Sequence, residues 1–185
     1  MEVEFESTDK NIERCWAKLG DRFFDTDTIQ SFPRRSFRFK RTVVFDLDHT
    51  LVETVVGENG SFVMHIRTEM IEVVKRLTKS RVTEVILWTN GRVDYAAQAV
   101  VALEETFGKL FDFVVARSIR NFLTTEFYSK NLTNIKRTET SVLVDDSFHS
   151  TRTHILCSKF NWKKVNEEEE KREAKFVLDT IFLLL

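Results

Sequence analysis

The chain has 185 residues, a length at which one domain can bury a substantial core. Hydrophobic residues make up 42% and charged residues 31%, and the single proline and five glycines argue against a long linker or a low-complexity tail. The formal net charge of −1 gives no support for nucleic-acid binding, which usually needs a basic excess, so nucleic acid is not an expected partner.

The two cysteines, Cys15 and Cys157, lie far apart and outside any metal-ligand spacing, which excludes a disulfide scaffold or a zinc module. The acidic residues 1–6 lack the basic and apolar regions of a signal peptide, and the longest apolar stretch, residues 181–185, is too short to span a bilayer. We therefore expect an intracellular protein, cytoplasmic or nuclear, that is neither secreted nor bound to a membrane. The sequence does not define an oligomeric state.

Residues 1–40 are expected to form an N-terminal extension ahead of a domain over residues 41–185, with a short helix over residues 11–19. Five basic residues lie close together before the first apolar run: Arg34, Arg35, Arg38, Lys40 and Arg41. Two interpretations remain open, a solvated edge that leads into a strand and a docking patch for an acidic or phosphorylated partner.

Unbroken apolar runs over residues 42–45, 85–88 and 142–144 predict strands that are buried on both faces, as in a parallel sheet. Residues 113–115 are a candidate fourth strand. Residues 52–66 predict a hairpin whose turn contains two glycines, Gly57 and Gly60.

Apolar residues at helical spacing predict helices between these strands. One helix is marked by Met70, Val74 and Leu77, and the next by Val93, Ala96, Ala97, Val100 and Val101. A last helix is expected after a cap at Asn166, with an apolar side formed by Phe176, Val177, Ile181 and Phe182. The alternation of strands and helices predicts a three-layer α/β fold with a mainly parallel sheet.

Polar residues follow three of the predicted strands: Asp46 and Asp48, then Thr89 and Asn90, then Asp145 and Asp146. In open α/β sheets, ligands bind beyond the carboxyl ends of the strands. An ordinary turn or a helix cap can account for any one of these ends. Three strand ends with such residues at one edge of a sheet instead predict a site that binds phosphate or a metal ion.

Residues 43–52 contain the pattern Asp-x-Asp-x-Thr between apolar residues, and Thr89, Lys130 and the pair Asp145–Asp146 follow in order. This ordered set resembles the haloacid dehalogenase superfamily of phosphotransferases. Residues 88–90, 128–132 and 143–147 are similar to one branch of it, the small NLI-interacting-factor-like phosphatases of the RNA polymerase II C-terminal domain. Two departures are Asp146, where that branch often has Asn, and Arg67-Thr68, where it usually has Arg-Pro.

The resemblance implies a Rossmann-like sheet with a hairpin flap and a short β insertion, and it implies that Asp46 is the nucleophile. A carboxylate is ionised at neutral pH and needs no base, so Asp46 can attack phosphorus and form an acyl phosphate. Because nucleophile and phosphate are both anionic, a cation is needed between them, and Mg²⁺ suits oxygen ligands. Its expected ligands are the Asp46 carboxylate, the Asp48 backbone carbonyl and the Asp146 carboxylate.

We also expect roles in the same reaction for the other residues of this ordered set. The Asp48 side chain is expected to protonate the leaving oxygen and then to activate water. The Thr89 hydroxyl, the Asn90 backbone amide and the Lys130 ammonium are expected to hold the phosphoryl oxygens. Asp145 is expected to orient a bound water or Lys130. For Thr89 a helix cap, and for Lys130 a surface position with Lys136 in its place, remain alternatives. His49 is interpreted as a spacer or rim residue, and His65, His149 and His154 show no ligand spacing.

The segments 52–83 and 91–129 leave no room for a full cap domain, and an open site admits a phosphorylated side chain of a protein. We therefore expect a phosphoprotein or phosphopeptide substrate that carries phosphoserine or phosphothreonine. Residues 119–128, with Phe122, Phe127 and Tyr128, are a candidate recognition surface or else a small sheet that packs on the domain. The alternative functions are a non-catalytic protein-binding module of the same fold and a phosphatase of nucleic-acid ends.

Overall fold

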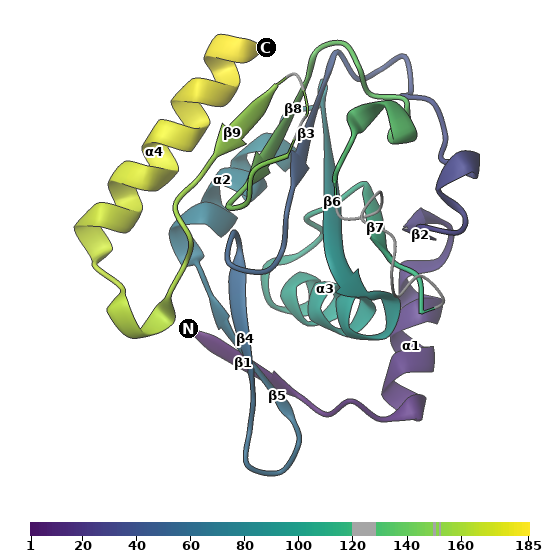
Figure 1. The fold of residues 1–185 in the computed structure, drawn as a ribbon, viewed down its shortest axis with the longest axis vertical. Coiled ribbons are helices and arrows are strands. Elements are labelled where there is room, and N and C mark those ends of the chain that lie inside the picture. The colour runs from purple at the N-terminus through teal and green to yellow at the C-terminus, as the bar shows by residue number, and fades with distance from the viewer. Residues whose placement is uncertain (120–128, 150, 152) are drawn as a thin grey trace.

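The computed structural model describes residues 1–119, 129–149, 151 and 153–185, and Figure 1 shows its fold. A six-stranded parallel sheet forms the centre, with the strand order β2-β7-β6-β3-β8-β9. In that order the strands are Phe23–Asp25, Phe113–Arg117, Thr83–Arg92, Arg41–Phe45, Ser141–Asp145 and His154–Leu156. The predicted fold class is confirmed.

All four strands predicted from apolar runs are present, as β3, β6, β7 and β8. The strand β6 is longer than expected, because it continues beyond Thr89 to Arg92 and shifts its register against β7 between Trp88 and Arg92. Such an irregularity bends a strand locally and redirects its side chains. Thr89 and Asn90 therefore lie in the bent end of a strand and not in a loop after it.

Helices cover one face of this sheet, where α2 (Thr68–Thr78) and α3 (Val93–Phe107) pack on side chains such as Val43 and Phe45. The helix α1 (Asp9–Leu19) packs on α3, and α4 (Glu167–Leu184) packs on α2 and along β9 (Figure 1). In the described part of the chain, short helical turns over residues 29–31 and 132–135 cover the other face, against residues such as Val44.

The predicted hairpin consists of β4 (Val52–Val56) and β5 (Phe62–Ile66). Gly60 adopts φ 75° in its turn, a conformation that favours glycine. The strand β1 (Glu2–Phe5) pairs antiparallel with β5, so that residues from the predicted extension complete the small sheet and, through β2, the large one. The division of the chain at residue 40 remains a prediction.

The last helix corrects one expectation about its apolar side. Asn166 caps α4 as predicted, because its side chain accepts hydrogen bonds from the backbone amides of Glu168 and Glu169. The buried face, however, is formed by Ala174, Val177 and Ile181, whereas Phe176 and Phe182 are 54% and 47% exposed. Residues three and four positions apart share a helix face, so Phe176 and Phe182 fall to either side of the buried stripe.

Two residues of the basic cluster contact the rest of the domain. Arg35 donates hydrogen bonds to the carbonyl and hydroxyl of Thr140, and Arg41 donates to the hydroxyl of Thr83. These contacts favour the interpretation of the cluster as an edge that leads into β3. Apart from Ile119 the candidate recognition surface, with Phe122, Phe127 and Tyr128, lies outside the described residues. None of the described helices has the length and apolar character that crossing a membrane requires.

Candidate active site

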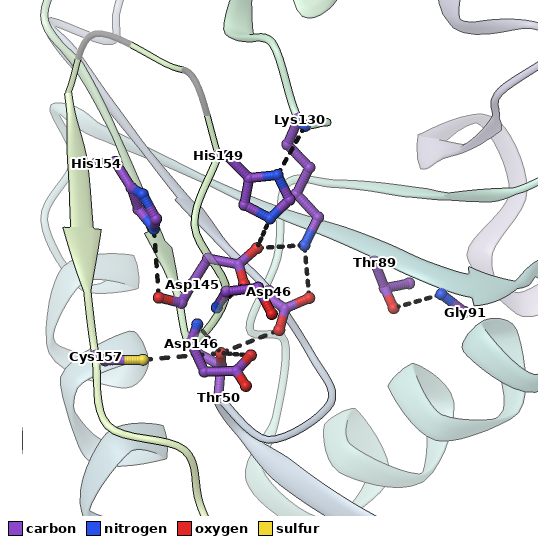
Figure 2. A network of polar contacts seen from close by, with 11 residues as sticks. Asp46, Thr50, Thr89, Gly91, Lys130, Asp145, Asp146, His149, His154 and Cys157 are labelled. Carbon is purple, nitrogen blue, oxygen red and sulfur yellow. Dashed lines mark hydrogen bonds and ion pairs between the residues drawn. The ribbon is translucent and has the colours of Figure 1, made fainter. Parts of the chain in front are cut away.

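Three carboxylates meet beyond the carboxyl ends of β3 and β8. Asp46 follows β3, Asp145 ends β8 and Asp146 comes next, and one oxygen atom from each lies within 4.8 Å of the others. The parallel register that pairs Phe45 with Val144 delivers the following residues side by side. Figure 2 shows these side chains converging on a common centre.

Lys130 joins two of these carboxylates. Its ammonium lies 2.6 Å from Oδ1 of Asp46 and 2.6 Å from Oδ2 of Asp145, and the side chain is only 1% exposed. Burial opposes the charged ammonium, but the two carboxylates outweigh it and raise the pKa of Lys130. Lys136 instead donates to the carbonyls of Gln30 and Phe32. The structure therefore brings Lys130, and not Lys136, to the cluster.

Both carboxylate oxygens of Asp145 are occupied. Oδ2 accepts from Lys130 and lies 2.9 Å from Nε2 of His149, and Oδ1 accepts from the backbone amide of Ser147. Burial alone raises the pKa of Asp145, but the hydrogen bonds from His149 and Lys130 bring it down to about 2. Asp145 is thus placed to hold Lys130, which matches one of its two expected roles.

His149 was not recognised from the sequence as part of the site. The backbone amide of Lys130 donates to Nδ1 of His149, so the ring proton lies on Nε2 and is directed at Asp145 (Figure 2). The sequence signal was its position four residues after Asp145, but only the fold brings Lys130 to its other side.

Thr50 bridges the residues that follow β3 and β8 through hydrogen bonds. Its hydroxyl donates to Oδ2 of Asp46 at 3.0 Å and accepts from the backbone amide of Asp146 at 3.1 Å. The loop between Asp46 and Thr50 turns back sharply at His49, whose φ is 63°. Thr50 belongs to the quoted motif, yet the sequence analysis gave it no role.

The side chain of Asp48 is held by a contact of its own, separate from the Lys130 and Thr50 contacts of Asp46. The hydroxyl of Tyr95 in α3 donates to Oδ1 of Asp48 at 2.6 Å and also lies 2.8 Å from the hydroxyl of Thr54 in β4. Burial raises the pKa of Asp48, and the hydrogen bond from Tyr95 offsets part of that effect. A raised pKa is what a carboxyl group needs if it is to carry a proton near neutral pH.

Thr89 lines the same pocket as the cluster, and its hydroxyl bonds to Gly91 rather than to the carboxylates (Figure 2). Its hydroxyl accepts from the backbone amide of Gly91 at 2.9 Å, and Arg92 rather than Thr89 precedes the first residue of α3, so the helix-cap alternative does not apply. A pocket of about 410 Å³ collects every predicted site residue together with several neighbours: Asp46, Asp48, His49, Thr89, Asn90, Gly91, Lys130, Asp145, Asp146, Ser147, His149 and Lys159.

The charges in this pocket fit a divalent cation. Burial, only partly offset by Lys130, raises the pKa of Asp46 to about 7. The ionised form of Asp46 therefore depends on the cations beside it. A divalent cation among Asp46 and Asp146 would favour the ionised form, and the all-oxygen donor set matches Mg²⁺.

Comparisons with known proteins identify the family of the chain and support its fold. A family model described as NLI interacting factor-like phosphatase matches residues 41–173, a range that contains every residue of the pocket. No curated protein matches the chain. A solved structure of Fcp1, "an essential RNA polymerase II CTD phosphatase", is similar with a TM-score of 0.53 and 17% identity, over 75% of this chain and 49% of that one.

A second structure, fission yeast Fcp1-R271A bound to beryllium fluoride, matches with a TM-score of 0.52 and 17% identity, over 75% of this chain and 50% of that one. The chain thus spans about half the length of these structures, and at this identity the likeness shows the fold alone. The family model matches more than half of the chain. The chain belongs to the NLI interacting factor-like phosphatase family.

Proposed function

We propose that the protein is a Mg²⁺-dependent phosphatase that hydrolyses phosphoserine or phosphothreonine in protein segments through an aspartyl-phosphate on Asp46. The observation that carries this proposal is the position of Asp46, which shares a pocket with Lys130, Asp146 and Asp48. The family of the chain supports the same reaction class.

In the first step, a carboxylate oxygen of Asp46 attacks phosphorus, and the bond from phosphorus to the ester oxygen breaks. The leaving alkoxide takes the proton of Asp48. Burial raises the pKa of this carboxyl group, and the hydrogen bond from Tyr95 holds its orientation. Lys130 and Thr50 hold the two Asp46 oxygens and so fix the direction of attack.

In the second step, Asp48 accepts a proton from a water molecule, and the resulting hydroxide attacks the phosphorus of the acyl phosphate. The bond between phosphorus and the Asp46 oxygen breaks, which restores the carboxylate and releases inorganic phosphate. Thr89, the backbone amide of Asn90 and Lys130 are assigned to the non-reacting phosphoryl oxygens, because all three line the same pocket.

The residues that would hold Mg²⁺ are Asp46 and Asp146, through their carboxylates, and Asp48, through its backbone carbonyl. Asp145 is not among these expected ligands, and Lys130, His149 and Ser147 hold its carboxylate. When bound, the ion offsets the repulsion between an anionic nucleophile and an anionic phosphate.

Two arguments support a protein substrate. The pocket is open to solvent in the part of the chain that the structure describes, with only a hairpin after the first motif and no cap over it. The similar Fcp1 structures are named as phosphatases of the RNA polymerase II C-terminal domain, and we extend that substrate class to this chain as part of the proposal. The complete Lys130 network argues against a non-catalytic binding module.

The test is the hydrolysis of p-nitrophenyl phosphate and of phosphoserine peptides, with Mg²⁺ and with chelator, by the wild type and by Asp46→Asn. We expect turnover only by the wild type with Mg²⁺. Asp21→Asn, the same chemical change at an exposed position, is the matched control and should retain full activity. Equal turnover by the wild type and Asp46→Asn would refute the assignment of the nucleophile.

A further inference from the structure

Both ring nitrogens of His149 are held by neighbouring residues. The backbone amide of Lys130 donates to Nδ1 at 3.1 Å, and Nε2 lies 2.9 Å from Oδ2 of Asp145, with the side chain only 6% exposed. A backbone amide can only donate, so Nδ1 keeps its lone pair and the ring proton lies on Nε2. The main chain of Lys130 therefore fixes the tautomer that lets His149 donate to Asp145.

These contacts close a ring of hydrogen bonds around the Lys130 side chain (Figure 2). Lys130 donates from its backbone to His149, His149 donates to Asp145, and the same Oδ2 atom of Asp145 accepts from the Lys130 ammonium at 2.6 Å. A lysine side chain is long and flexible, so a defined position for its ammonium needs partners that are themselves fixed. His149 is one of the groups that fix Asp145.

His149 also supports the negative charge of Asp145. Burial raises the pKa of this carboxyl group, and the hydrogen bond from His149 is the first of the contacts that bring it down to about 2, ahead of the charge of Lys130. A neutral imidazole stabilises the carboxylate without adding a second cation that would compete with Lys130. The ammonium can then lie 2.6 Å from both Asp145 and Asp46.

The same geometry argues against a direct chemical role for His149. A general acid or base needs a ring nitrogen that can reach the substrate or a bound water. Here Nδ1 faces the backbone of Lys130 and Nε2 faces Asp145. The ring is linked to Asp46 through Lys130, whose ammonium contacts both carboxylates.

We propose that His149 positions the Lys130 ammonium for catalysis, by holding the carboxylate of Asp145 through its Nε2–H. This inference rests on the proposed function and adds to it a residue that acts through Lys130. Without the ring, the ammonium loses its fixed place beside Asp46, the expected nucleophile. The effect is expected on kcat more than on KM, because the charge that Lys130 offsets grows in the transition state.

The experiment compares kcat and KM of three variants with those of the wild type, on p-nitrophenyl phosphate and on a phosphoserine peptide with Mg²⁺. His149→Leu removes both contacts and should lower kcat about tenfold or more on both substrates. His149→Gln can place its amide nitrogen where Nε2 lies and donate to Asp145, so it should recover most of that loss. His149→Asn can accept from Lys130 but is too short to reach Asp145, so its kcat should stay low.

His154→Leu is the matched control. Nε2 of His154 lies 3.3 Å from the backbone carbonyl of Asp145, so this ring contacts the main chain of the residue whose carboxylate His149 holds. The variant should keep wild-type kcat and KM. Thermal unfolding of every variant separates the two causes of a loss, because a packing defect would make kcat follow Tm, whereas kcat should follow the presence of a donor to Asp145.

NMR of the imidazole nitrogens in the wild-type chain gives a measurement that does not depend on activity. We expect the proton of His149 on Nε2, with Nδ1 unprotonated as the acceptor of the Lys130 amide. A proton on Nδ1 alone would overturn the inference, because Nε2 could then not donate to Asp145.

The kinetic outcomes separate this inference from the proposed function. Wild-type turnover with equal kcat in the three His149 variants would overturn the positioning role while the phosphatase stands. Equal losses in His149→Gln and His149→Asn, or the same loss in His154→Leu, would also overturn it. If His149→Leu does not fold, the Gln and Asn variants carry the test. A wild type that hydrolyses neither substrate would overturn the proposed function and the positioning role with it.

Discussion

The hydroxyl of Tyr95 donates a hydrogen bond to Oδ1 of Asp48, with 2.6 Å between the two oxygens. The contact joins the first turn of α3 to the loop after β3, and it leaves the Asp48 carboxyl in a fixed direction inside the pocket. We infer that Tyr95 positions the general acid, a role that the sequence did not indicate.

Tyr95→Phe tests that role, because it removes the hydroxyl and keeps the ring that packs near Phe62. The variant should lose about tenfold or more in kcat for a phosphoserine peptide, whose alkoxide leaving group needs a proton. p-Nitrophenyl phosphate has a better leaving group, so its hydrolysis should fall much less. Steady-state kinetics on both substrates checks this, and an equal loss on both would contradict the assignment.

Lys130→Met removes the cation between Asp46 and Asp145 and leaves two buried carboxylates facing each other. We expect loss of activity and a decrease of about 3 kcal/mol in the free energy of unfolding. Urea unfolding measures the second effect. Lys136→Met is the comparison, since that lysine contacts only backbone carbonyls, and a similar decrease in both variants would argue against a special role for Lys130.

Gly91→Ala tests the close packing under the phosphate-binding residues. A Cβ atom at Gly91 would lie 3.0 Å from the Tyr95 ring and 3.1 Å from the Thr89 hydroxyl, so both side chains must shift. The cost in stability should be about 1 kcal/mol, whereas kcat/KM should fall by a larger factor because two site residues move together. Wild-type kcat/KM in a folded Gly91→Ala protein would show that this packing does not position the site.

Mg²⁺ should stabilise the protein even where no substrate is present. At a concentration about 100 times its Kd, a ligand that binds only the folded state adds about 2.7 kcal/mol to the free energy of unfolding, which thermal unfolding detects as a higher Tm. Asp146→Ala removes one expected ligand and should abolish most of the shift. An equal shift in the wild type and in Asp146→Ala would place the ion elsewhere.

Local patterns sufficed to predict the central sheet and the residues at its carboxyl edge. The strands β3, β6 and β8 are short apolar runs, and a parallel sheet brings the polar residues after them to one rim without further information. The strands β1 and β2 escaped prediction because they are short and their partners, β5 and β7, lie far along the chain.

Properties that depend on tertiary contacts were not predictable. The role of His149 arises only when the fold brings Lys130 beside it, and the pKa of Asp46 is raised first by burial and then by the neighbouring carboxylates of Asp145 and Asp48. The apolar residues of α4 likewise fit more than one helix face, and packing on α2 decides that Val177 is buried and Phe176 is not.

The most direct test of the account is to quench the enzyme in acid during turnover of a phosphopeptide with Mg²⁺ and to map the phosphorylated residue by mass spectrometry. The account predicts phosphate on the peptide that contains Asp46, its release by hydroxylamine as expected of an acyl phosphate, and no such peptide from Asp46→Asn. Phosphate on another residue, or undiminished turnover by Asp46→Asn, would contradict it.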